Sequence, residues 1–98
     1  MKIQKEQTAK TVILTLEGRL DTTTSPELET VLVSELGDAA ELIFDLEHLE
    51  YISSAGLRVL LAEQKKMNTQ GTMIIRNVGE SVREVFEITG FTDILTIQ

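Results

Sequence analysis

A run of four small residues, Ser53, Ser54, Ala55 and Gly56, is the segment of this sequence best suited to chemistry. It stands where an apolar strand is expected to give way to a helix, the junction at which ligands and reactive groups collect in open α/β sheets. A serine hydroxyl at a helix N-terminus, beside side chains of little bulk, is accessible to another protein's active site. A phosphoryl group there adds about −1.5 to −2 charges, which the helix dipole and its free N–H groups tolerate. The segment therefore indicates a serine phosphorylation site that changes how a partner docks.

A purely structural role would also explain these residues. Ser53 or Ser54 could cap the helix by accepting a hydrogen bond from a free N–H, a contact worth about 1 kcal/mol. Gly56 would then serve only to allow close packing. Because a cap needs one hydroxyl and the segment has two, the residues leave both roles open.

Catalytic and metal chemistry find little support elsewhere. His48 is the only histidine and no nucleophile-elbow motif accompanies it, so no Ser-His-Asp triad is predicted. The six glycines form neither a Walker A loop nor a dinucleotide fingerprint. Glu47, His48 and Glu50 offer metal-ligand atoms but no fixed ligand spacing, and we interpret them as a solvated loop after the strand. We expect no enzyme, no cofactor and no metal site.

Length and charge limit the remaining classes. The 98 residues, 42% of them hydrophobic, suffice for one folded domain over residues 1–98. A net charge of −7 disfavours binding to nucleic acid, which needs clustered basic side chains. No apolar run approaches the ~20 residues of a membrane span, and the first residues lack a signal-peptide core. We expect a cytoplasmic protein, monomeric when free.

Apolar periodicity and helix-breaking residues predict the order of the elements. The expected strands are Met1–Gln7, Thr11–Glu17, Glu41–Leu46, Thr72–Val78 and, weakly, Ile94–Ile97. The expected helices run from Thr24–Pro26 to Gly37, from Ser54 to Asn68 and from Ser81 to Thr89. After an antiparallel hairpin, strands and helices alternate. This order predicts an α/β fold with a small, mixed, mostly parallel sheet of four to five strands flanked by helices.

Two finer features are also expected. Thr24 with Glu27, and Ser81 with Glu84, have the spacing of capping boxes. The strand core Leu42–Phe44 is apolar without alternation, which is typical of a central strand covered on both faces.

Taken together, several segments resemble bacterial STAS domains of the anti-sigma factor antagonist type. They are Leu16–Asp21 (LEGRLD), Phe44–Leu46 (FDL), Tyr51–Leu57 (YISSAGL), Val82–Phe86 (VREVF) and Gly90-Phe91 (GF). The resemblance covers nearly the whole chain. It implies a small mixed sheet flanked by helices and a binding protein without enzymatic activity.

In such families the antagonist belongs to a partner-switching circuit. The anti-sigma factor is also a serine kinase, and it phosphorylates the antagonist. The unphosphorylated antagonist binds that kinase and so frees the sigma factor, and a PP2C-type phosphatase resets the site. The resemblance implies the same partners for this chain.

The resemblance also assigns residues. The family's acceptor lies two residues before the Gly of a Gly-Leu pair, which selects Ser54 over Ser53. Asp21 matches an acidic residue that the family has near the acceptor. It would orient the serine hydroxyl or contact the kinase, or it would only open a turn. Thr22 and Thr24 would line the same surface, or cap the next helix.

The motif departs from the best-known sporulation and stress-response antagonists. Those have Asp before the acceptor and Ser or Thr after it, where this chain has Ser53 and Ala55, and Arg58 replaces a Gly. The loss of an Asp removes one charge that would repel a phosphoserine, and Arg58 can approach the phosphate or an acidic partner. Ser53, Ala55, Gly56 and Arg58 are also expected to contact the partner.

Other classes compete with the phosphorylated switch. A constitutive STAS scaffold, or an accessory domain of a transporter, would use the same surface without a phosphate. A nucleotide-hydrolysing enzyme lacks a base, nucleophile and metal set. An aspartyl phosphoreceiver needs a cluster of acids after its first strand and a late lysine, where this chain offers Asp21 alone and Asn77.

Overall fold

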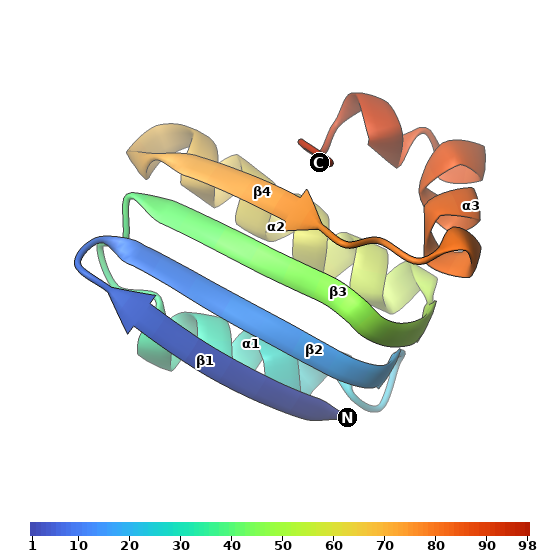
Figure 1. The fold of residues 1–98 in the computed structure, drawn as a ribbon, viewed down its shortest axis with the longest axis horizontal. Coiled ribbons are helices and arrows are strands. Elements are labelled where there is room, and N and C mark those ends of the chain that lie inside the picture. Colours follow the sequence, from blue (N-terminus) through green and yellow to red (C-terminus); the bar gives the residue numbers. More distant parts are fainter.

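The computed structural model describes all 98 residues and alternates strands with helices after an initial hairpin (Figure 1). The strands are β1 (Lys2–Thr8), β2 (Thr11–Leu20), β3 (Glu41–Ile52) and β4 (Thr72–Arg76). The helices are α1 (Ser25–Glu35), α2 (Ser54–Gln70) and α3 (Glu80–Thr89), and a short 3-10 turn covers Phe91–Asp93.

The strands form one sheet in the order β1-β2-β3-β4. β1 and β2 pair antiparallel across a tight turn, whereas β2 with β3 and β3 with β4 pair parallel. The predicted mixed, mostly parallel sheet is confirmed with four strands. The fifth strand expected at Ile94–Ile97 is reduced to one isolated parallel bridge between Ile75 and Ile97.

The helices cover only one face of this sheet. In Figure 1, α1 and α2 lie behind the strands, and no helix crosses in front of them. Burial alternates accordingly: Leu42 and Phe44 are fully buried, while Ile43 between them is only half-buried. The prediction that this strand is covered on both faces is wrong. Ile43 lies in register between Ile13 and Ile74, so neighbouring isoleucines shield one another on the open face.

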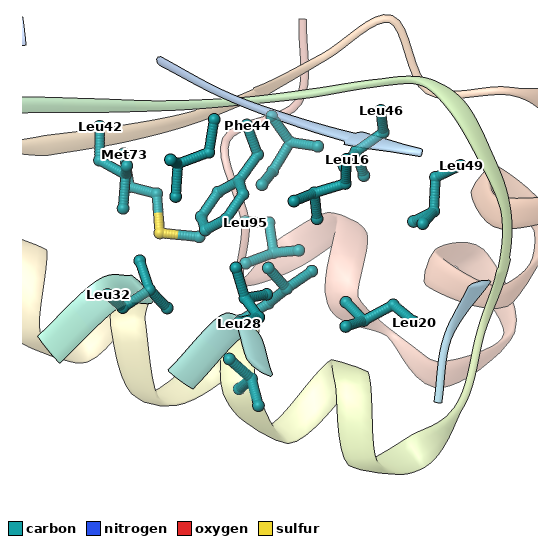
Figure 2. Close-up of a cluster of buried hydrophobic side chains, with 14 of the residues drawn as sticks. Leu16, Leu20, Leu28, Leu32, Leu42, Phe44, Leu46, Leu49, Met73 and Leu95 are labelled. Atoms are coloured by element: carbon teal, nitrogen blue, oxygen red, sulfur yellow. The ribbon is translucent and has the colours of Figure 1, made fainter. Parts of the chain in front are cut away.

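The core lies between the sheet and the helices as one cluster of 22 buried residues. Figure 2 shows the side chains of Leu16, Phe44 and Met73 extending from the strands toward Leu28 and Leu32 of α1. Such burial, worth about 1.5–3 kcal/mol for each large apolar side chain, holds α1 and α2 against the strands.

β3 continues six residues beyond its predicted end at Leu46. Register shifts interrupt its pairing with β2 between Thr15 and Glu17 and between Gly18 and Arg19, and they change the spacing of buried residues. The buried positions along this part are Leu46, Leu49 and Ile52, three residues apart rather than two. A bulged strand loses the alternation by which a strand is recognised.

The loop expected to hold His48 is therefore a strand. His48 pairs with Glu17 of β2, and its side chain is exposed as predicted.

Both predicted capping boxes are wrong. Thr24 does occupy the N-cap of α1, but its hydroxyl donates to the carbonyl of Arg19 at 2.7 Å and makes no cap contact. α3 begins at Glu80 after Gly79, one residue earlier than predicted, and the hydroxyl of Ser81 lies 3.5 Å from the carbonyl of Glu50. Each hydroxyl instead binds a carbonyl near the end of a strand.

Candidate phosphorylation and partner-docking site

The junction between β3 and α2 is held against the end of β2. Ser53 is extended (φ −99°, ψ 177°), and its N–H donates to the carbonyl of Leu20 at 2.9 Å. Its carbonyl accepts from the N–H of Leu57 at 2.9 Å, which starts the helical hydrogen bonding. α2 thus begins at Ser54, as predicted, directly beside the end of β2.

The two serines face different surroundings. The hydroxyl oxygen of Ser53 is buried and has no hydrogen-bond partner, whereas Ser54 is exposed as the first residue of α2. Ser53 occupies the N-cap but makes no side-chain cap contact, so the capping role considered for it is not realised. Of the two hydroxyls, that of Ser54 is the one accessible to another protein.

Gly56, the third residue of α2, belongs to its first turn and is buried. A Cβ atom at this position would lie 2.8 Å from Cγ1 of Ile52, 2.8 Å from Cγ of Leu20 and 3.0 Å from the carbonyl oxygen of Leu20. Only glycine lets the helix approach the two strand ends this closely. Gly56 therefore holds the start of α2, with Ser54, close to the strand ends, and it is buried rather than part of an exposed contact surface.

Asp21 organises the turn between β2 and α1. Its Oδ1 accepts from the hydroxyl of Thr23 (2.8 Å) and from the N–H groups of Thr23 and Thr24 (both 3.1 Å). The Thr23 hydroxyl and the Thr24 N–H are the main causes that hold the pKa of Asp21 below its usual value, against partial desolvation. The structure thus shows the turn-opening role of Asp21; its predicted contact with a kinase remains a prediction.

Arg19 and Tyr51 join this group, although the sequence analysis did not single them out. The guanidinium of Arg19 lies 4.2 Å from the centre of the Tyr51 ring, and its Nε lies 3.8 Å from Oδ2 of Asp21. The two residues pair across β2 and β3 beyond the second register shift. Both lie in motifs that carry the family resemblance, but the register that joins them depends on the bulges.

A hollow of about 410 Å³ opens between the start of α1 and the first turns of α2. It unites three of the predicted contact residues, Thr22, Ala55 and Arg58. Its other lining residues are Ser25, Pro26, Glu29, Val59 and Ala62. Asp21 and Thr24 lie in the turn beside it and do not line it.

Arg58 adds a positive charge near Ser54. Residues four apart on a helix share a face, and Arg58 follows Ser54 by four. Arg58 is exposed and forms no ion pair within the chain. It is therefore available to a phosphate on Ser54 or to an acidic group of a partner.

No group of three acidic, histidine or cysteine side chains in the chain is arranged to hold a metal ion. Glu17, Glu47, His48 and Glu50 instead line an open, acidic hollow of about 440 Å³ at the β2–β3 bulge. None of the helices is both long and apolar enough to cross a membrane.

A four-stranded mixed sheet with helices on one face is the architecture of the class to which this protein belongs. The chain belongs to the STAS domain family, which matches residues 2–98. Among its relatives is BtrV of Bordetella bronchiseptica, which is named as an anti-sigma factor antagonist. The two are 34% identical over 99 residues, covering 99% of this chain and 85% of BtrV.

The anti-sigma-B factor antagonist of Staphylococcus aureus is also 34% identical, over 82% of this chain and 76% of its own. These names describe binding proteins rather than enzymes, in agreement with the sequence analysis.

Solved structures share the fold. An anti-sigma factor antagonist from Mycobacterium paratuberculosis has a TM-score of 0.88 at 23% identity, covering 98% of this chain and 83% of its own. Unphosphorylated SpoIIAA, an anti-sigma factor antagonist, has a TM-score of 0.71 at 20% identity, covering 99% of this chain and 87% of its own. The predicted fold class is therefore confirmed.

Proposed function

We propose that this protein is an anti-sigma factor antagonist that works as a phosphorylation-controlled binding switch. With Ser54 unmodified, it binds an anti-sigma factor that is also a serine kinase, and the sigma factor is set free. Phosphorylation of Ser54 releases the kinase, and a PP2C-type phosphatase restores the binding form. The observation that carries this proposal is the exposure of Ser54 at the start of α2 beside the buried hydroxyl of Ser53.

The chemical step belongs to the kinase, and this chain supplies the acceptor. The Ser54 oxygen attacks the γ-phosphorus of ATP, a new P–O bond forms, the bond to the β-phosphate bridging oxygen breaks, and ADP leaves. The hydroxyl proton passes to a base of the kinase. Because the acceptor is the first residue of α2, the product phosphate lies next to unpaired N–H groups of the first turn.

The phosphate changes the docking surface more than the fold. It adds about −1.5 to −2 charges to a chain whose net charge is already −7. A partner surface that complements the neutral serine then meets both bulk and altered charge, which weakens the complex. The Arg19–Tyr51 pair and the hollow at Thr22, Ala55 and Arg58 supply the rest of the proposed contact surface.

The circuit implies where the protein acts and in what form. We propose a cytoplasmic location, where sigma factors and their kinases act, and a monomeric free protein folded as one domain over residues 1–98. The relatives named as anti-sigma factor antagonists support the partner class.

The proposal is tested by incubating the purified protein with ATP and lysate of its native host and mapping phosphate by mass spectrometry. We expect one phosphate on Ser54, absent from Ser54→Ala and retained in the matched control Ser53→Ala. A phosphate on another residue, or none while other serine kinases in the lysate are active, would contradict the switch. The second outcome would favour a constitutive scaffold or transporter-accessory role.

A further inference from the structure

A second hollow, of about 90 Å³, lies farther along the seam between α1 and α2. Its lining residues are Glu29, Leu32, Val33, Val59, Ala62 and Glu63. Three of these, Glu29, Val59 and Ala62, also line the hollow next to Ser54. The two hollows therefore adjoin along the seam between both helices, which lie on the same face of the sheet in Figure 1, and together they are called the α1–α2 groove.

Glu63 is the unusual member of this groove. Glu63 is only 7% exposed, and its Oε2 atom is buried and accepts no hydrogen bond. Buried carboxylates normally have a cationic or N–H partner. The chain provides no such partner for this oxygen. Lys66, three residues further along the same helix, forms no ion pair with it.

The remaining walls of the groove suit an aliphatic side chain with a cationic end. Val33 is a hydrophobic residue that is 83% exposed. Leu32, Val59 and Ala62 continue the apolar surface next to it. Glu29 places a second carboxylate on the opposite helix and forms no ion pair, although Arg58 lines the adjoining hollow with it. Apolar walls with acidic groups on both helices match the stem and head of an arginine or lysine side chain.

We propose that the α1–α2 groove is a docking site for a basic side chain, arginine or lysine, of a protein partner. The aliphatic stem packs on Val33 and Val59, and the cationic head donates hydrogen bonds to Glu63 and Glu29. The site goes beyond the switch at Ser54, because it contacts the partner away from the phosphorylated residue. Its contribution to the binding affinity does not depend on whether Ser54 is phosphorylated.

The test uses acetyl-leucyl-arginine amide as the probe and acetyl-leucyl-citrulline amide as its uncharged isostere. Each is titrated into ¹⁵N-labelled, unphosphorylated protein while amide shifts are followed by NMR. We expect saturable shifts at Glu29, Val33 and Glu63 with the arginine probe, and binding weaker by about fivefold or more with the citrulline probe. The ¹³C titration midpoint of the Glu63 carboxyl should fall when the arginine probe is bound, because a bound cation favours the ionised form.

Glu63→Gln should weaken binding of the arginine probe by about fivefold or more, and Glu87→Gln on α3 serves as the matched surface control with unchanged binding. Equal binding of both probes, shifts that do not saturate, or undiminished binding to Glu63→Gln would overturn the proposal. Groove shifts that depend on protein concentration alone would overturn it in favour of a second copy of this chain as occupant. Because no kinase or phosphate enters this experiment, its failure leaves the Ser54 switch standing, and the reverse also holds.

Discussion

The N–H of Ser53 donates a hydrogen bond of 2.9 Å to the carbonyl of Leu20, and this contact joins the start of α2 to the end of β2. The chain is thereby turned so that the Ser53 hydroxyl is buried while the next residue, Ser54, is exposed. Two adjacent and chemically identical side chains thus differ in exposure because of a backbone contact between strand and helix. The accessible serine is determined by tertiary structure rather than by residue type.

Removal of the Ser53 hydroxyl should not destabilise the protein. Because this oxygen is buried without a partner, we expect Ser53→Ala to leave the free energy of unfolding within about 0.5 kcal/mol of the parent, or to raise it. Urea denaturation at pH 7 measures the change. A loss of about 1 kcal/mol or more would mean that Ser53 caps α2 after all.

Gly56→Ala should destabilise the protein by about 1–3 kcal/mol, because the new methyl group overlaps Leu20 and Ile52 at the strand ends. Gly79→Ala is the control: nothing lies within 4 Å of a Cβ there, and we expect a loss below about 1 kcal/mol. Thermal and urea unfolding of both variants give the comparison. Equal losses would show that the close approach of α2 to the strands is not what requires Gly56.

Glu63 should make stability depend on pH. Burial raises the pKa of its carboxyl above the ordinary value, and the charge of Lys66 offsets this only partly. The folded state therefore holds the proton more tightly than the unfolded state, so the contribution of Glu63 to stability is greatest below pH 4.5 and falls as pH rises through the raised pKa.

Glu63→Leu removes the buried carboxylate and should raise the free energy of unfolding at pH 7 by about 1 kcal/mol. The gain over the parent should disappear below pH 4. Urea titrations at several pH values measure it, and a gain that is the same at all pH values would contradict the ionisation of Glu63 as its cause.

Asp45 should show the opposite dependence. Its partial burial alone would raise its pKa, but hydrogen bonds from the Glu47 N–H and the Asn77 amide, with the charge of Arg76, hold the pKa below 3.8. Its contribution is therefore present above pH 3.8 and is lost as pH falls through the lowered pKa.

We expect Asp45→Asn to cost about 1–2 kcal/mol at pH 7, since the carboxylate ties β3 to the end of β4 through Arg76 and Asn77. The deficit should shrink in acid, as measured by urea unfolding across pH. Asp93→Asn, an exposed acid in the 3-10 turn, should change little. A deficit that persists unchanged at low pH would refute the electrostatic explanation.

The sequence predicted the elements that have regular periodicity and missed those that depend on distant contacts. The start of α2 at Ser54 and the end of α3 at Thr89, before Gly90 (φ +79°), follow from local residue preferences, and both are confirmed. The extension of β3 to Ile52 was missed because the bulges opposite β2 break the alternation of buried residues.

Side-chain partners were predictable only in part. Thr24 has the residue type and position of an N-cap, but its hydroxyl oxygen accepts from the N–H of Asp21 at 2.8 Å while the hydroxyl donates to the carbonyl of Arg19. Similarly, Arg19 and Tyr51 are ordinary residues in sequence, and only the bulged register places one over the other. The hollow that unites Thr22 with Arg58 depends on how α1 lies against α2, which no local pattern encodes.

The central claim is that a phosphate on Ser54 controls binding to the kinase. The most direct test measures the dissociation constant of that kinase, by isothermal titration calorimetry, for the unmodified protein and for protein carrying phosphoserine at position 54. We predict binding at least about tenfold weaker for the phosphorylated form, a difference of about 1.4 kcal/mol. Equal affinities for two correctly folded forms would contradict the switch.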